Sequence, residues 1–242
     1  MSTIRTSQRG PAGAGRFTAA AVGLIAGCVL VALSAPIVAG AAAALPGDLA
    51  ARGLRQRADL GDEELLTLIS SRSRAIERYG ALDWRRELAT ASVVPRGGKV
   101  ETAAVDRAMA QTRITLEQGP ASPQDWLRLS ILETMKGERA PAVRHLSTAL
   151  LTGADMPRLR WGVLDVGFEL WRDLPPETRL SALRALRNAW TGADRRERAA
   201  LLGDMRDRGF LPLARMVLAQ EEGLDEALTG LGIAGQGGSG AP

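Results

Sequence analysis

The feature that most constrains this chain is one long apolar stretch near its N-terminus. Residues 17–45 contain no charged side chain, and Arg5, Arg9 and Arg16 precede them. About 20 apolar residues are enough to cross a hydrocarbon core roughly 30 Å thick. No other apolar segment of the 242-residue chain is as long. We therefore predict a single transmembrane anchor over residues 17–45.

The charges beside this stretch predict its orientation. The basic tail, residues 1–16, has no acidic residue, and short basic tails stay on the cytoplasmic side of a membrane. Arg52, Arg55 and Arg57 follow the stretch and favour the opposite orientation, because the rule counts basic residues and gives acids little weight. We expect the tail to be cytoplasmic and the body of the chain to lie on the other side.

Two kinds of processing are alternatives to a retained anchor. Residues 39–41 and 42–44 have the small-x-small pattern that a signal peptidase needs, although the apolar run exceeds the usual h-region of roughly 7 to 15 residues. Residues 25–28 resemble a lipobox ending in Cys28, but an apolar segment follows them where a mature lipoprotein normally has a polar tether. A retained anchor fits the length of the stretch best.

Composition argues against several classes of function. The formal net charge is +4, and the three arginines of the tail supply +3 of it, so the remaining chain carries only +1. No nucleic-acid partner is therefore expected. His145 is the only histidine and Cys28 the only cysteine, which excludes an intrachain disulfide and a cysteine-based metal site. With no coherent catalytic constellation in the sequence, we expect no enzyme activity and no cofactor.

The five tryptophans could pack in a core or stack on sugars. Most of them fall at helical spacing among apolar neighbours, which favours core packing. Trp84 lies between Asp83 and Arg85 and is the one that we expect to be exposed. His145 is interpreted as a polar helix residue near a turn.

The body of the chain predicts an all-α fold. Apolar residues recur with a helical period, and no segment shows the alternation of a strand. We expect a linker or helix extension over residues 46–61, a helical domain over 62–229 and a disordered Gly-rich tail over 230–242. Helices are expected at 62–79, 82–90, 101–118, from 123, at 138–151, from 156, and at 176–190, 193–207 and 211–221. Short Gly or Pro turns between them are typical of antiparallel helix pairs.

One segment, residues 123–156, has the register of a tetratricopeptide repeat (TPR). Small residues would let its two antiparallel helices approach closely, larger apolar residues would fill the gaps beside them, and a glycine would permit the tight turn. A helical bundle whose alanines happen to fall in this register is the alternative. The positions that define the register are Trp126, Leu129, Ser130, Gly137, Ala142, Leu146, Ala149 and Pro157.

Residues 126–218 resemble a known family. The resemblance depends on the segments 126–129 (WLRL), 146–153 (LSTALLTG), 157–159 (PRL) and 168–175 (FELWRDLP). They are similar to membrane-anchored, TPR-like proteins of the VpsP type, which are found with bacterial exopolysaccharide genes. These are packing motifs, so the resemblance identifies no functional residue.

The resemblance implies a non-enzymatic scaffold or adaptor in exopolysaccharide biosynthesis or export. Such a protein would lie in the bacterial inner membrane as a single-pass protein, with its C-terminal domain periplasmic and with other membrane or envelope proteins as partners; contact with polysaccharide stays open. For the partner-binding surface we predict Leu127, Ile131 and Thr134, which share one face of the first helix of the repeat. The alternative is a soluble periplasmic binding module or chaperone, released by signal-peptide cleavage.

Overall fold

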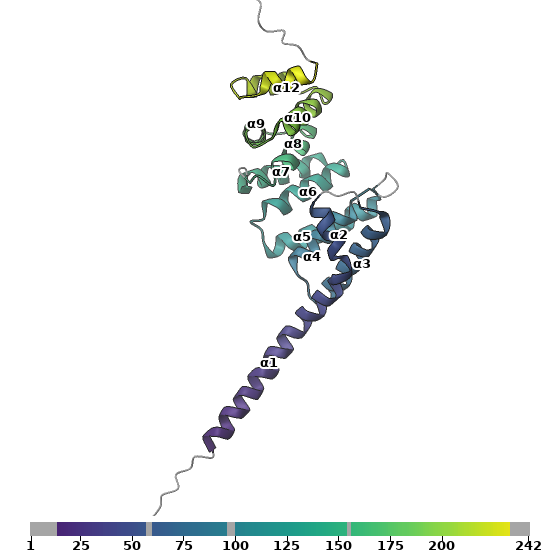
Figure 1. Ribbon diagram of the computed structural model, residues 1–242, viewed down its shortest axis with the longest axis vertical. Helices are drawn as coiled ribbons and strands as arrows, with labels where there is room; N and C mark the ends of the chain where they lie inside the picture. Colours follow the sequence, from purple (N-terminus) through teal and green to yellow (C-terminus); the bar gives the residue numbers. More distant parts are fainter. Residues whose placement is uncertain (1–13, 57–59, 96–99, 154–155, 233–242) are drawn as a thin grey trace, which may run out of the picture. The chain divides into compact units, whose positions relative to one another are not determined.

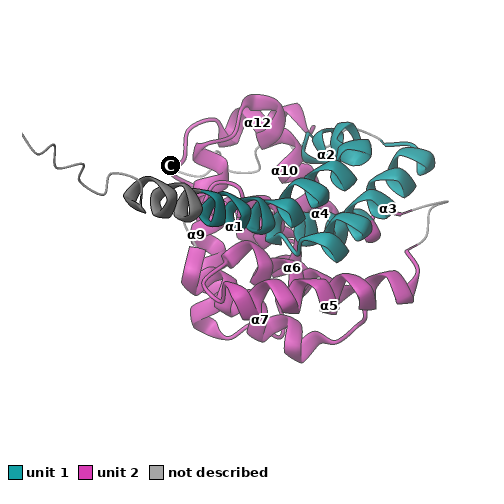
Figure 2. Cartoon of the chain, turned by 90° about the horizontal axis from the view of Figure 1, so that it is seen from below, with its two compact units in different colours: residues 1–91 teal, residues 92–242 magenta. Residues whose placement is uncertain are grey.

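The computed structural model describes residues 14–56, 60–95, 100–153 and 156–232. These residues form helices and no strand, which confirms the all-α prediction. They divide into two compact units, Met1–Ala91 and Ser92–Pro242, coloured separately in Figure 2. The helical domain predicted over 62–229 is therefore not one body, because its first two helices belong to the unit that contains the apolar stretch. Most of the predicted cytoplasmic tail lies outside the described residues.

The first unit is built around the apolar helix. Of the two interpretations of residues 46–61, a linker or a helix extension, the extension fits better, because a turn of 3-10 helix and a short α-helix occupy most of the segment. Ala50 and Ala51 of that short helix are buried and pack with Leu68 and Ala91. The elements of the unit are α1 (Ala14–Ala44), η1 (Leu45–Gly47), α2 (Asp48–Arg55), α3 (Asp62–Arg78) and α4 (Leu82–Ser92).

Within the described residues, one helical run is long and apolar enough to cross a membrane. It comprises Leu24–Arg55, and its most apolar part is almost entirely exposed. Every residue from 24 to 38 is exposed, whereas Gly40 and Ala44 are buried against the rest of the unit. Figure 1 shows α2 and α3 gathered at this end of α1. The last part of the predicted anchor 17–45 therefore belongs to the packed unit, and residues 17–38 form a candidate span about 33 Å long at 1.5 Å per residue.

A buried arginine links the end of α1 to the other helices of the first unit. The Arg72 side chain of α3 is 2% exposed. Its guanidinium donates from Nη1 to the Ala44 carbonyl at 2.7 Å, from Nη2 to Asp48 at 2.9 Å and from Nε to Glu87 at 2.5 Å. Arg55 of α2 also pairs with Glu87. Because the last carbonyls of a helix lack intrahelical partners, Arg72 satisfies α1 where it meets α2, α3 and α4.

The second unit consists of successive helices joined by short connections. Leu186, Trp190, Leu202 and Met205 are fully buried in its core. Two details differ from the expected elements: a helix that the sequence did not predict follows α11, and α8 begins at Arg160 rather than near residue 156. The elements are α5 (Thr102–Gln118), α6 (Pro123–Met135), α7 (Arg139–Gly153), α8 (Arg160–Glu169), α9 (Pro176–Thr191), α10 (Arg195–Asp207), α11 (Leu211–Leu218) and α12 (Leu224–Gly230).

The end of the chain is more ordered than predicted. Gly230 lies within α12, and Leu231 packs against the core of the second unit. The rest of the predicted tail, from residue 233, lies outside the described residues.

Helical hairpins stack on one another in the second unit. Helices α6 and α7 pack together, and so do α8 and α9. In addition, α6 contacts α8, and α7 contacts both α8 and α9. The α6–α7 hairpin therefore packs against the α8–α9 hairpin through both of its helices, which is how helical repeats build a continuous core.

The α6–α7 hairpin shows why the sequence register produces close packing. Ala142 and Ala149 are buried, and the Ser130 hydroxyl donates across the hairpin to the Ala142 carbonyl at 2.7 Å. Ser122 caps α6 by accepting from the backbone N–H of Asp125. Gly137 has a φ of 77° in the turn, a conformation that costs glycine little. The small residues thus lie where the two helix backbones come closest.

Candidate functional site

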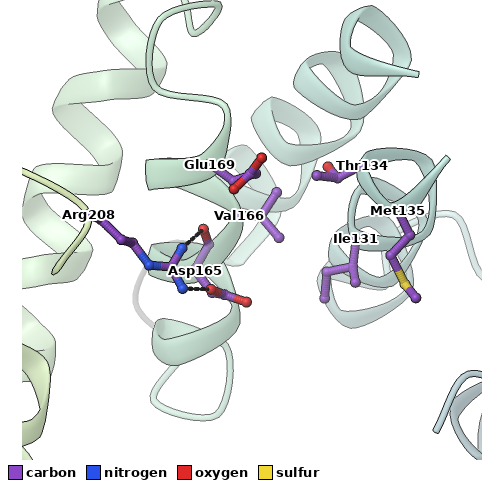
Figure 3. A pocket seen from close by; sticks show the side chains of 7 residues that line it. All are labelled: Ile131, Thr134, Met135, Asp165, Val166, Glu169 and Arg208. Atoms are coloured by element: carbon purple, nitrogen blue, oxygen red, sulfur yellow. Dashed lines mark hydrogen bonds and ion pairs between the residues drawn. The ribbon is translucent and has the colours of Figure 1, made fainter. Parts of the chain in front are cut away.

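An open pocket in the second unit is lined by helices from three successive hairpins. Its volume is about 330 Å³. Figure 3 shows side chains of α6 on one side of it and side chains of α8, with Arg208 from the end of α10, on the other. The lining residues are Ile131, Thr134, Met135, Asp165, Val166, Glu169 and Arg208.

Part of the pocket is apolar. Val166 is 4% exposed and belongs to the core, and Ile131 is half-buried against that core. Met135 is 45% exposed. A methionine side chain is flexible and polarizable, so it adapts to differently shaped apolar groups. These three residues offer a surface for an apolar side chain.

The positive charge of the pocket is already neutralised. The Arg208 guanidinium donates to the backbone carbonyl of Asp165 at 3.2 Å, pairs with the Asp165 carboxylate, and donates to Asp204 at 2.9 Å. Burial of Arg208 opposes its charge, but the hydrogen bonds to Asp165 and Asp204 outweigh burial and raise its pKa. Arg208 therefore joins α8 to the end of α10 and is not a free anion-binding group.

Of the two carboxylates that line the pocket, that of Glu169 has the weaker ion pairing. Its side chain is 56% exposed, and its Oε1 lies 3.9 Å from Nη1 of Arg139. The same arginine donates a shorter bond of 2.7 Å to Asp173, so its pairing with Glu169 is weak. With Asp165, Glu169 and Arg208 in the lining, the pocket has a net charge of about −1 at neutral pH.

The predicted partner-binding residues separate into two groups. Ile131 and Thr134 both line the pocket, and the Thr134 hydroxyl donates to the Ser130 carbonyl within α6 at 2.8 Å. Leu127, by contrast, is 5% exposed and lies in the core. A Cβ added at Gly162 of α8 would approach its Cδ2 to 3.0 Å. The structure thus corrects the role of Leu127 to packing, because α8 covers that end of the helix face.

No sequence pattern identified the remaining lining residues in advance. Met135 belongs to the same helix as the predicted residues, but Asp165, Val166, Glu169 and Arg208 come from two later helices. Only the stacking of the hairpins brings them to α6. A prediction limited to one repeat could not find them.

His145 belongs to a separate network within the α6–α7 hairpin. Its Nδ1 lies 2.6 Å from Oε2 of Glu133, whose side chain is 1% exposed. The imidazole stacks on Trp126 with ring centroids 5.3 Å apart, and Arg113 lies 4.0 Å from the same carboxylate. The interpretation of His145 as a structural helix residue fits this packing.

Most of the tryptophans pack as the sequence predicts. Trp190 is fully buried, and Trp126, Trp161 and Trp171 are partly buried against the core of the second unit. The prediction of an exposed Trp84 is wrong, because this side chain is half-buried and lies beside Gly40 of α1.

Comparisons with known proteins add no family to these observations. No model of a known protein family matches the sequence, and no curated protein is significantly similar to it. Among the described residues, no group of three or more His, Cys, Asp and Glu side chains is placed to hold a metal ion.

Proposed function

We propose that this chain is a non-enzymatic, membrane-anchored adaptor that binds protein partners through its TPR-like helical hairpins. The observation that carries this proposal is the pocket that α6, α8 and the end of α10 form on successive hairpins. Helical-repeat proteins use such surfaces, shared by neighbouring repeats, to bind extended or helical segments. The proposed role lies in bacterial exopolysaccharide biosynthesis or export, and the resemblance of residues 126–218 to VpsP-type proteins supports it.

The lining of the pocket defines the chemistry of the segment that it would bind. A volume of about 330 Å³ is near the lower end of the roughly 300–1,000 Å³ of ligand pockets, so it suits a short segment. An apolar side chain would pack on Ile131, Met135 and Val166. A neighbouring lysine or arginine of the partner would pair with Glu169, whose contact with Arg139 is weak.

The packing at the end of α1 supports a retained anchor over a cleaved signal peptide. Cleavage after residue 41 or 44 would cut the helix within the part that packs on the first unit. Gly40 and Ala44 are buried there, and Arg72 holds the Ala44 carbonyl. A retained anchor with a cytoplasmic N-terminus would leave the helical hairpins in the periplasm at high local concentration near membrane partners.

Site-specific photo-crosslinking in bacterial cells tests the pocket. A photoreactive amino acid replaces Met135, and a matched one replaces Met216, which is 68% exposed outside the pocket. We expect adducts with a defined envelope protein at Met135 and none of them at Met216. A Glu169→Arg substitution should abolish these adducts, whereas Glu177→Arg on the exposed start of α9 should not.

Two results would contradict the proposal. One is an identical set of adducts at Met135 and Met216, and the other is full insensitivity to Glu169→Arg. The role in exopolysaccharide synthesis is tested separately, since deletion of the gene should lower the amount of secreted polysaccharide and the Glu169→Arg variant should fail to restore it.

A further inference from the structure

An abrupt boundary on α1 separates residues whose side chains are exposed from residues that pack against the rest of the first unit. Val38 is 64% exposed, and every described residue before it back to residue 24 is exposed as well. Two residues later, Gly40 is buried. An apolar helix without covering side chains is stable in lipid, whereas the covered part carries a polar, folded unit. If α1 spans a membrane, it would leave the hydrocarbon core near Val38.

Three side chains of α3, α4 and their connection form a collar beside this boundary. Arg78 donates from Nη1 to the Ala39 carbonyl at 3.4 Å. A Cβ added at Gly40 would lie 2.8 Å from the Trp84 ring and 2.9 Å from Cβ of Tyr79. Tyr79 and Trp84 contact each other edge to face, with ring centroids 6.3 Å apart. We name Arg78, Tyr79 and Trp84 the collar.

The collar has the composition of side chains that lie in a membrane interface. Tryptophan and tyrosine are enriched at the level of lipid headgroups, where an apolar ring and a polar tip are both accommodated. An arginine guanidinium hydrogen-bonds phosphate well. Arg78 and Tyr79 are exposed, so they are free to contact lipid while they touch α1.

We propose that the collar lies in the lipid headgroup layer and seats the first unit on the bilayer surface. The inference rests on the proposed membrane anchoring of α1 and extends it, since it names lipid headgroups as ligands of the folded unit. Leu45, which is 65% exposed, lies seven residues beyond Val38, or about 10.5 Å along the helix axis. The headgroup layer is roughly 5 to 8 Å thick on each side of the hydrocarbon core, so a dye attached at Leu45 would report from just beyond its outer edge.

Fluorescent labels on the full chain test this placement. In a Cys28→Ser background, single cysteines replace Leu33, Leu45 or Glu63 and carry an environment-sensitive dye. The labelled proteins are reconstituted in phosphatidylcholine–phosphatidylglycerol vesicles whose lipids bear a spin-label quencher on the headgroup or on the acyl chain. Glu63 is the aqueous control, because the helix rise places it roughly 22 Å along α3 from Arg78. The vesicles contain no other protein, so any quenching comes from lipid.

The inference predicts three different responses. The label at Leu33 should be quenched by the acyl-chain spin label, and the label at Glu63 by neither. The label at Leu45 should be quenched several-fold more than that at Glu63, and more by the headgroup spin label than by the acyl-chain one. Quenching at Leu33 but not at Leu45 would overturn the proposed position of the collar in the headgroup layer but would leave the membrane anchor supported. No quenching at Leu33 would overturn the anchor and the seating with it.

A charge reversal tests whether the collar itself binds headgroups or whether the label at Leu45 is quenched only because it lies near the membrane. Arg78→Glu should markedly reduce headgroup quenching at Leu45 in the anionic vesicles. Arg74→Glu, on the exposed surface of α3 one turn earlier, should leave it unchanged. Equal effects of the two substitutions, with helical circular dichroism retained, would refute a specific role for the collar.

Discussion

Replacing Arg72 with methionine gives the sharpest test of how α1 is joined to the first unit. Methionine fills much of the same volume but removes every charge-assisted hydrogen bond of the side chain. Breaking a buried ion pair by removing one partner costs about 3–5 kcal/mol. Asp48 is 49% exposed and can regain water, and Glu87 keeps its pair with Arg55. We therefore expect the lower end of that range, about 3 kcal/mol, most of it from the stranded Ala44 carbonyl and the partly buried Glu87.

Hydrogen exchange of the full chain in lipid vesicles, read by mass spectrometry, measures this cost locally. A loss of 3 kcal/mol in the opening free energy of α3 raises the exchange rate of its core amides by roughly 100-fold. Arg74→Met, on the exposed surface of the same helix, is the control and should change the opening free energy by less than about 0.5 kcal/mol. An increase below about fivefold for Arg72→Met, or equal increases for both variants, would refute the reasoning.

The remaining predictions concern packing. Leu127→Asp should unfold the second unit, because it buries an unpaired charge at a core position, whereas Thr134→Asp should keep the thermal unfolding midpoint within a few degrees; equal midpoints would show that Leu127 is not core. Gly40→Leu should lower the protease resistance of the first unit several-fold, because the added side chain meets Trp84 and Tyr79, whereas Gly27→Leu should not, since no atom lies within 4 Å of a Cβ there. Equal resistance of these two variants in limited proteolysis would contradict the close packing at Gly40.

Local patterns predicted most of the helices but not how they associate. Apolar periodicity located α3, α5 and α9 and the start of α6 to within a residue or two, because that signal lies within each helix. The composition of residues 46–61 allowed either a linker or a helix extension, and Pro46 and Gly47 in fact form the 3-10 turn of η1 that leads directly into α2. Periodicity alone does not show that such a short segment is stabilised by burial of Ala50 and Ala51 against α3.

Contacts between distant residues account for what the sequence could not predict. Arg72 lies 28 residues from Ala44, and nothing in its neighbourhood distinguishes it from the solvated arginines around it. Arg208 lies 43 residues from Asp165, so half of the pocket depends on the stacking of separate hairpins. Ile131 and Thr134 were predictable because one helix face sufficed to place them. Leu127 lies on the same face, but α8 covers its side chain.

The central claim is that a retained anchor carries the helical hairpins. The most direct test is the intact mass of the protein in the membrane and periplasmic fractions. We expect the full-length chain in the membrane fraction, with no modification at Cys28. A soluble periplasmic species that begins near Ala42 or Leu45 would contradict the anchor and favour a released binding module. A lipidated species that begins at Cys28 would contradict it in favour of a lipoprotein.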